Sequence, residues 1–428
     1  MYNIFFEERL GKHMTRVVKS TNNILMIFWI VLFVFRDLLS EISPVFSYID
    51  EAPLLIFVIK MAVKTLQSKR IIMRKGNGQY IFAICLFVMV GLLGNIIYRY
   101  QTVNLVIVDL LTNLKFFGAL AYFGELTCKD SGGGSRISQL SCLLTVFLFM
   151  LFLLDRVLNV FPSDYRYGIK ATRLFFNHPT YLAGICVFLI ALMTIYNVEK
   201  NLPYIGMNMI MMIFTLRSKA IVSAVLFVVL YVVIVKLHAK LKVWQMVIVG
   251  IVCIVCAWSQ IYFNFVFLGG QSARPVMLFT SFKIMKDYFP IGTGFGCYAS
   301  HSAAVNYSPV YIKYGFNYIY ELRNAAEGTF FDDQFWPIIF GQTGVIGTAA
   351  YICILVFLFR KVQKLFKVNL KTYTAALVVF IYLLVSSTAE PAFNIAVAIP
   401  LAMVLEICYS QADQYRNAQK SVKKRGMK

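Results

Sequence analysis

Charged side chains are scarce in this sequence. Only 14% of the 428 residues are Asp, Glu, Lys or Arg, whereas 59% are hydrophobic. The apolar residues form blocks of about twenty, the length of a helix that crosses a bilayer, which excludes a soluble globular protein. The blocks are apolar on every face instead of alternating, which excludes a membrane β-barrel.

Three further features are missing. No histidine, carboxylate or additional thiol lies close to Cys253 and Cys256, whose spacing alone suits a metal, so we expect neither a metal nor another cofactor. The N-terminal tail lacks the small-residue cleavage site of a signal peptide. No internal repeat with matching Gly- or Pro-broken helices is visible, which argues against a secondary transporter.

The apolar blocks predict an all-α polytopic integral membrane protein, with residues 1–428 forming one transmembrane domain. Twelve helices are expected, at 22–39, 45–63, 79–98, 103–124, 138–160, 177–196, 202–216, 218–236, 243–267, 333–359, 371–389 and 393–410. Between the ninth and tenth lies one long polar loop, 269–332, in which short amphipathic helices are expected.

Lysine and arginine predict the orientation. Most of the 41 basic residues lie in segments that share one side of the membrane if both termini are cytoplasmic, notably 67–75, 236–242, 360–371 and 421–428. We therefore expect a multi-pass membrane protein with both termini in the cytoplasm and the long loop outside. Anionic headgroups then account for the net charge of +21, and nucleic acid is not an expected partner.

Several arginines fall on the expected outer side, although basic residues tend to lie on the cytoplasmic side. They are Arg166, Arg173, Arg217 and Arg274. Guanidinium groups suit the bidentate recognition of phosphate, so these residues are predicted to bind a phosphorylated substrate. The alternative is that they pair with Asp155, Asp164 or lipid headgroups.

His178 stands at the start of the sixth predicted helix, in Asn177-His178-Pro179. Proline suits the first turn of a helix, and Asn177 suits the N-cap. His178 is either part of the helix start or a residue that contacts substrate.

The long loop has distinct parts. Residues 274–289 show the spacing of an amphipathic helix on the outer surface. Residues 290–296, PIGTGFG, place glycines at alternate positions, which predicts a tight turn, a close approach of two backbones or a phosphate nest. Aromatic residues follow, including Tyr298, Tyr314 and Tyr318, which suit either stacking on sugar rings or an interfacial belt.

Three segments occur in an order that resembles the O-antigen polymerase and ligase superfamily, the Wzy and WaaL-type membrane glycosyltransferases. They are TLRSKAIVSAVLF at 215–227, RPVMLFTSFKIMKDYFPIGTGFG at 274–296 and FFDDQFWPIIFGQTGVIGTAAYICILV at 330–356. The shared features are an arginine-led segment ending in P-x-x-G-x-G and a later Q-x-G-x-x-G. The resemblance covers 177–356 and implies a GT-C-like fold.

The resemblance implies a polymerase of O-antigen or capsular repeat units. Such an enzyme transfers a glycan from undecaprenyl diphosphate onto a second lipid-linked unit. The transfer takes place at the outer face of a bacterial plasma membrane (the inner membrane of a Gram-negative cell), with membrane lipid and a chain-length regulator protein as further partners. Family arginines match Arg217 and Arg274 as diphosphate ligands. The ligase branch has a histidine where this chain has Asp332 and Asp333, which favours polymerisation.

Two alternatives stay open. A ligase needs a histidine base, for which His178 and His301 are the outer candidates. A transporter (flippase) of the lipid-linked oligosaccharide needs polar groups along a path through the bilayer, for which Lys60, Asp109, Lys115 and Glu406 are the candidates.

Glycosyl transfer from a diphosphate needs positive charge at the leaving group and a base for the incoming hydroxyl. Guanidinium groups supply the charge without a metal, and a carboxylate supplies the base. We therefore expect a metal-independent glycosyltransferase. The candidate bases are, in order, Asp332 and Asp333, then Glu327, then Glu390. Asp333 also suits the start of the tenth helix, and Glu390 is costly at bilayer level unless it is used or paired.

Overall fold

The computed structural model describes residues 2–68, 78–127, 134–240, 262–267, 272–323 and 330–425, and the single residues 245, 251 and 258; the side chains of 2–21, 264 and 416–425 are not described. Nearly all of this is helical, apart from a hairpin of strands β1 (Tyr165–Arg166) and β2 (Ile169–Lys170). Within the described residues, seven helical segments are long and apolar enough to cross a membrane. The chain is therefore an all-α membrane-embedded protein.

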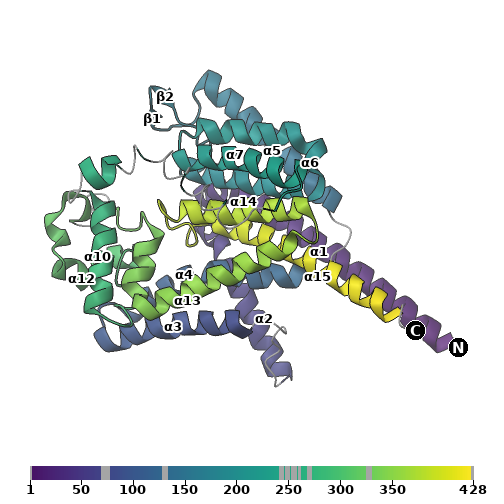
Figure 1. The fold of residues 1–428 in the computed structure, drawn as a ribbon, viewed down its shortest axis with the longest axis horizontal. Coiled ribbons are helices and arrows are strands. Elements are labelled where there is room, and N and C mark those ends of the chain that lie inside the picture. Colours follow the sequence, from purple (N-terminus) through teal and green to yellow (C-terminus); the bar gives the residue numbers. More distant parts are fainter. Residues whose placement is uncertain are drawn as a thin grey trace.

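Figure 1 shows the long helices packed together, most of them side by side. They are α1 (Tyr2–Ile42), α2 (Ala52–Ser68), α3 (Gly78–Tyr98), α4 (Val103–Thr127), α5 (Gly134–Leu158), α6 (Pro179–Phe214), α7 (Ser218–Leu230, continued by a π-helical turn, Tyr231–Lys236), α13 (Phe335–Leu365), α14 (Leu370–Ser386) and α15 (Ala398–Arg425). Helices predominate because a bilayer offers the backbone no other hydrogen-bond partners. The predicted helix at 243–267 lies mostly outside the described residues, so the total of twelve stays a prediction.

Two predicted helices begin later than expected. The second predicted helix begins at Ala52 rather than 45, after a 3-10 turn at Pro44–Asp50, and the twelfth begins at Ala398 rather than 393. Proline explains both shifts, because it is tolerated in the first turn of a helix and not deeper. Pro53 and Pro400 lie within the first three residues of the two observed helices.

Helix α6 turns back on itself. A straight helix of its 36 residues is about 54 Å long. However, the Thr172 N–H, shortly before α6, donates to the Phe214 carbonyl at its end over 2.8 Å. Both ends of α6 therefore lie at the same end of the bundle, and the chain reverses near Asn197, whose φ and ψ are not helical. The break falls between the helices predicted at 177–196 and 202–216.

The loop after residue 271 folds into a small unit at one end of the helices. Its helices are α10 (Ala273–Asp287), α11 (His301–Val305) and α12 (Pro309–Lys313), followed by 3-10 turns at Phe316–Tyr318 and Tyr320–Leu322. Met277, Tyr298, Tyr311, Phe316 and Phe331 belong to a separate core within it. In Figure 1, α10 and α12 lie opposite the end from which both termini project. We call this the loop end.

The glycine-rich segment 290–296 joins this unit to α13. The N–H groups of Thr293 and Gly294 donate to the carbonyls of Gly341 and Gln342 over 3.0 and 2.9 Å. Gly292 approaches so closely that a Cβ there would lie 2.5 Å from the Gly344 nitrogen. The P-x-x-G-x-G and Q-x-G-x-x-G motifs are thus packed against each other, backbone to backbone.

The same segment also binds α3 and α4. The Phe295 N–H donates to Asn95 Oδ1 over 2.8 Å, and the Gly296 N–H donates to Asp109 Oδ2 over 2.9 Å. Four successive N–H groups, from residue 293 to 296, are therefore bonded inside the protein. The predicted close approach of two backbones is confirmed, and the predicted phosphate nest is wrong because these donors are already occupied.

Gly294→Ala is predicted to destabilise the protein more than Gly168→Ala. Both glycines have positive φ, which costs another residue about 1–2 kcal/mol. A Cβ at Gly168 meets nothing within 4 Å, whereas one at Gly294 lies 2.5 Å from the Asn95 backbone nitrogen. Melting temperatures of both variants in lipid nanodiscs measure the difference. Equal losses would show that the docking of 290–296 contributes little.

Candidate functional site

Three cations from two segments far apart in the sequence meet at the loop end. Arg217 is the N-cap of α7, Lys219 lies in its first turn, and Arg274 lies in the first turn of α10. The charges of Arg217 and Arg274 both act on Lys219, and that of Arg274 acts on Arg217. We call Arg217, Lys219 and Arg274 the cation cluster. The sequence analysis expected Arg217 and Arg274 to share one site, and the structure brings them within electrostatic range.

Two of these cations pair with partly exposed carboxylates. Arg217 Nη2 lies 2.9 Å from Asp164 Oδ2, and Arg274 Nη2 lies 3.2 Å from Asp333 Oδ2. The side chains of Arg274 and Asp333 are 35% and 33% exposed. Ion pairs open to solvent contribute roughly 0–1 kcal/mol. Another anion can therefore replace these carboxylates at little cost.

The third cation is buried with its partner. Lys219 donates to Glu390 Oε2, and their side chains are 11% and 12% exposed. The other oxygen of Glu390, Oε1, is buried and has no hydrogen-bond partner within the described part of the chain. A carboxylate fixed through one oxygen and free at the other can accept a proton from a ligand. The sequence analysis named Glu390 but missed Lys219, although this lysine also lies against the positive-inside tendency.

The predicted acids before α13 have different surroundings. Burial raises the pKa of Asp333, Arg274 opposes this shift, and repulsion from Asp332 adds to it. Asp332 is partly buried and has no hydrogen-bond or ion-pair partner among the described residues. Glu327 lies outside the described residues. The neighbouring Glu321 has a structural role, because it accepts a hydrogen bond from the Ala273 N–H at the start of α10 over 2.6 Å.

Arg166 and Arg217 of the cation cluster pair with the same acid, Asp164. Its Nε lies 3.2 Å from Asp164 Oδ2, the oxygen that also pairs with Arg217. Partial burial acts in the opposite direction, but Arg217 and Arg166 lower the pKa of Asp164. The alternative interpretation, in which outer arginines pair with acids, therefore holds for both arginines in this structure. Arg173 instead donates to the Asn177 carbonyl in its own loop, over 3.4 Å.

His178 is the N-cap of α6. Its Nδ1 accepts a hydrogen bond from the Thr180 N–H over 3.3 Å, with Pro179 in the first turn as predicted. The prediction that Asn177 caps this helix is wrong, because His178 occupies the N-cap position. Asn177 lies one residue earlier, and its N–H donates to Asp37 Oδ2 on α1. Loss of hydration and the charges of Arg217 and Lys219 lower the pKa of His178 to about 4. The imidazole is therefore neutral near pH 7 and a weak base.

The three tyrosines predicted to stack on glycan differ in access. Tyr298 is 0% exposed, and its hydroxyl donates to the Met277 carbonyl over 2.6 Å. Stacking by Tyr298 is therefore contradicted, because the ring forms part of the core of the loop unit. The Tyr314 hydroxyl donates to Asp287 over 2.6 Å, whereas Tyr318 is 83% exposed.

Metal ligands and a transport path were also considered. Among the described residues, no group of three His, Cys, Asp or Glu side chains is placed to hold a metal ion. Cys253 and Cys256 lie outside those residues. Two of the polar groups considered for a transport path are engaged elsewhere: Asp109 accepts from the Gly296 N–H, and Lys115 pairs with Asp50 and Glu51.

His178→Asn is predicted to reduce the loss of stability at low pH. The folded pKa of about 4 lies below the ordinary value of 6.5, so between these values the unfolded chain binds a proton that the folded chain does not. The contribution of His178 is complete above pH 6.5 and is lost as the pH falls towards 4. Asparagine retains an N-cap without this titration. Melting temperature against pH, with His301→Asn as control, measures the effect; identical profiles for wild type and His178→Asn would contradict it.

Comparison with models of protein families gives no match to this chain, and comparison with curated proteins gives none either.

Proposed function

We propose that this chain is a polysaccharide polymerase that acts on lipid-linked repeat units of an O-antigen or capsular type. In this proposal it transfers a glycan from undecaprenyl diphosphate to a second lipid-linked unit, at the outer face of a bacterial plasma membrane and without a metal. One observation carries the proposal: Arg217, Lys219 and Arg274 meet acids at one end of otherwise apolar helices. Charged groups at one end and apolar helices beyond them match a substrate with an anionic head and a hydrocarbon tail.

The cation cluster suits a diphosphate. Arg217 and Arg274 each present a guanidinium fork that is held by a partly exposed carboxylate. A diphosphate carries more charge than a single carboxylate and can accept from both forks at once. Each such charge-assisted hydrogen bond contributes about 1.5–3 kcal/mol, which exceeds what the exposed ion pairs contribute.

The chemistry follows from these positions. The acceptor hydroxyl oxygen forms a bond to the anomeric carbon of the donor sugar, and the bond from that carbon to the diphosphate oxygen breaks. Undecaprenyl diphosphate leaves with the bonding electron pair, and Arg217 and Arg274 stabilise its charge. The hydroxyl proton passes to the unpartnered Oε1 of Glu390. Lys219 is then a positioning residue for Glu390.

The first test is surface glycan length in cells whose only copy of the gene is deleted. Deletion should leave single repeat units, and the wild-type gene should restore a ladder. Arg217→Ala and Arg274→Ala should shorten or abolish the ladder, because each removes a diphosphate contact and weakens donor binding about tenfold or more. Arg323→Ala, an exposed arginine of the same loop unit, is the matched control and should restore a full ladder.

Other outcomes of this test select the alternatives. Lipid-linked polymer that accumulates inside the envelope of the deletion strain would indicate transfer or export of finished chains, as in a ligase or a transporter. A full ladder with both arginine variants, at wild-type protein levels, would remove the cation cluster from the mechanism.

Glu390→Gln is predicted to separate binding from transfer. The amide keeps the size of the side chain and an oxygen for Lys219, but it cannot take a proton. Transfer by purified protein in nanodiscs should fall about 100-fold or more, while donor binding stays within about twofold. Asp332→Asn and Asp333→Asn are the comparison variants, and a larger loss of transfer in either would place the base there. Glu390→Gln combined with Lys219→Met controls for the unpaired lysine.

A further inference from the structure

Helix α10 carries apolar side chains on two faces. One face, which includes Ile284, is buried in the core of the loop unit. The other face consists of exposed residues at the i, i+3, i+4 and i+7 positions of one helix surface, namely Phe279, Phe282, Lys283 and Lys286. Phe279 and Phe282 are 57% and 48% exposed. We call these four residues the outer face of α10.

The outer face continues the exposed apolar surface of α13. The ring centroids of Phe282 and Phe340 are 5.3 Å apart, and those of Phe340 and Trp336 are 5.7 Å apart. Further along α13, which is long and apolar enough to cross a membrane, Val345 and Ile352 are exposed as well. Tryptophan is enriched where membrane helices enter the headgroup region. Trp336, in the first turn of α13, therefore places Phe282 close to that depth.

The segment before the loop unit reaches the same face. Residues 262–267, YFNFVF, are mainly aromatic, and the ring centroids of Phe265 and Phe279 are 6.4 Å apart. Figure 1 shows α10 running across the direction of α3. A helix that crosses membrane-spanning helices lies along the membrane surface, so one side of α10 can touch the bilayer over its whole length.

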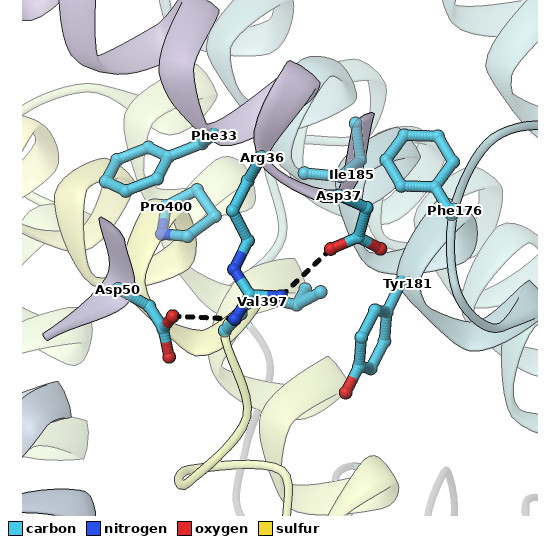
Figure 2. A pocket seen from close by; sticks show the side chains of 10 residues that line it. Phe33, Arg36, Asp37, Asp50, Phe176, Tyr181, Ile185, Val397 and Pro400 are labelled. Carbon is cyan, nitrogen blue, oxygen red and sulfur yellow. Dashed lines mark hydrogen bonds and ion pairs between the residues drawn. The ribbon is translucent and has the colours of Figure 1, made fainter. Parts of the chain in front are cut away.

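The lysines of the outer face differ from the cations inside the bundle. Figure 2 shows one of the latter, Arg36, which reaches between Asp37 and Asp50 with a nitrogen 2.9 Å from an oxygen of each acid. Lys283 and Lys286 have no ion-pair partner in the part of the chain that the structure describes. Their ammonium groups are therefore available to an anion outside the protein.

The composition of the outer face suits lipid better than protein. Lysine is depleted in protein–protein interfaces, whereas helices that lie on membranes combine phenylalanine with lysine. Long lysine side chains can reach headgroup phosphates while neighbouring rings enter the apolar region. The face has no acid of its own, because the neighbouring Asp287 accepts a hydrogen bond from the Tyr314 hydroxyl over 2.6 Å.

We propose that the outer face of α10 binds the surface of the lipid bilayer, with Phe279 and Phe282 inserted among the lipids and Lys283 and Lys286 at anionic headgroups. The inference uses no residue of the cation cluster and stands whether or not the chain is a polymerase. It also has a consequence for that cluster. Arg274 lies in the first turn of the same helix, so membrane binding by α10 holds this arginine near the level of the lipid phosphates.

Tryptophan fluorescence of the full-length protein in nanodiscs tests the depth of the two rings. Phe279→Trp and Phe282→Trp each add one indole to the four native tryptophans, and the excess signal over wild type reports the new side chain. Tyr318→Trp, at an 83% exposed position of the same loop unit, is the matched control. Phosphatidylcholine brominated on its acyl chains should quench the first two variants and spare the control. Iodide in the water should do the reverse.

A second measurement tests the lysines. In discs of mixed phosphatidylcholine and phosphatidylglycerol, with one lipid brominated at a time, the anionic lipid should quench Phe282→Trp about twofold more strongly. Adding Lys283→Gln and Lys286→Gln should remove this preference and leave quenching by phosphatidylcholine in place. Adding Arg323→Gln instead, which removes an exposed charge elsewhere in the loop unit, should keep the preference.

Three results would contradict the inference. Quenching of Phe279→Trp and Phe282→Trp by iodide and not by brominated lipid, as for Tyr318→Trp, would place the outer face in water. Protection from both quenchers would show that another protein chain covers it. Equal quenching by the two lipids, with both lysines present, would remove the anionic headgroups from the proposal. If Phe282→Trp does not fold, because its ring also packs on Phe340, Phe279→Trp carries both measurements.

Discussion

The docking of segment 290–296 against α3, α4 and α13 holds the rest of the loop end in place. Buried backbone groups must find partners inside the protein, and here the N–H groups of 293–296 find them on three helices. This docking anchors the loop unit that begins with α10. Arg274 at the start of α10 is thereby brought to Asp333, which precedes α13. The backbone contact therefore fixes where the charges of the site meet.

The carboxylates that pair with the cation cluster compete with any anion that binds there. Each of its members is paired with a carboxylate from another segment, so the cluster is close to neutral when it is empty. Positive charge at this end of apolar helices is tolerated because it is matched locally. An anion that binds has to displace Asp164 and Asp333, and these acids reclaim the arginines when it departs. Such competition limits the affinity of the cation cluster for an anion and favours release of the anion.

The sequence was sufficient for features that depend on local pattern. Hydropathy predicted the membrane class and most helix positions, and amphipathic spacing predicted α10. Contacts between distant segments could not be predicted. From the sequence alone, the glycines of 290–296 fitted a phosphate nest equally well. The carbonyls that accept from this segment lie far along the chain, since Gly341 is 48 residues from Thr293. Tyr298 looked available for stacking, because nothing near it in sequence shows that the loop has a core of its own.

The same limit applies to the charged residues. Arg217 and Arg274 were identified because they run against the positive-inside tendency, which is visible without a fold. Lys219 was passed over, because its significance depends on Glu390, which lies in the turn after α14. Helix α6 could be predicted from the sequence only in part. Its two halves were predicted, but only the bond between Thr172 and Phe214 shows that their outer ends are adjacent.

The docked segment also limits how this chain can change in evolution. Four consecutive N–H groups are matched to acceptors on three helices, so inserting or deleting one residue between 290 and 296 would put every later donor out of step. Changes of length can be absorbed more readily in the turn between β1 and β2, where Tyr167 is 81% exposed and a Cβ at Gly168 meets nothing within 4 Å. Homologous chains should therefore vary in loop length there, while the spacing from Pro290 to Gly296 stays constant.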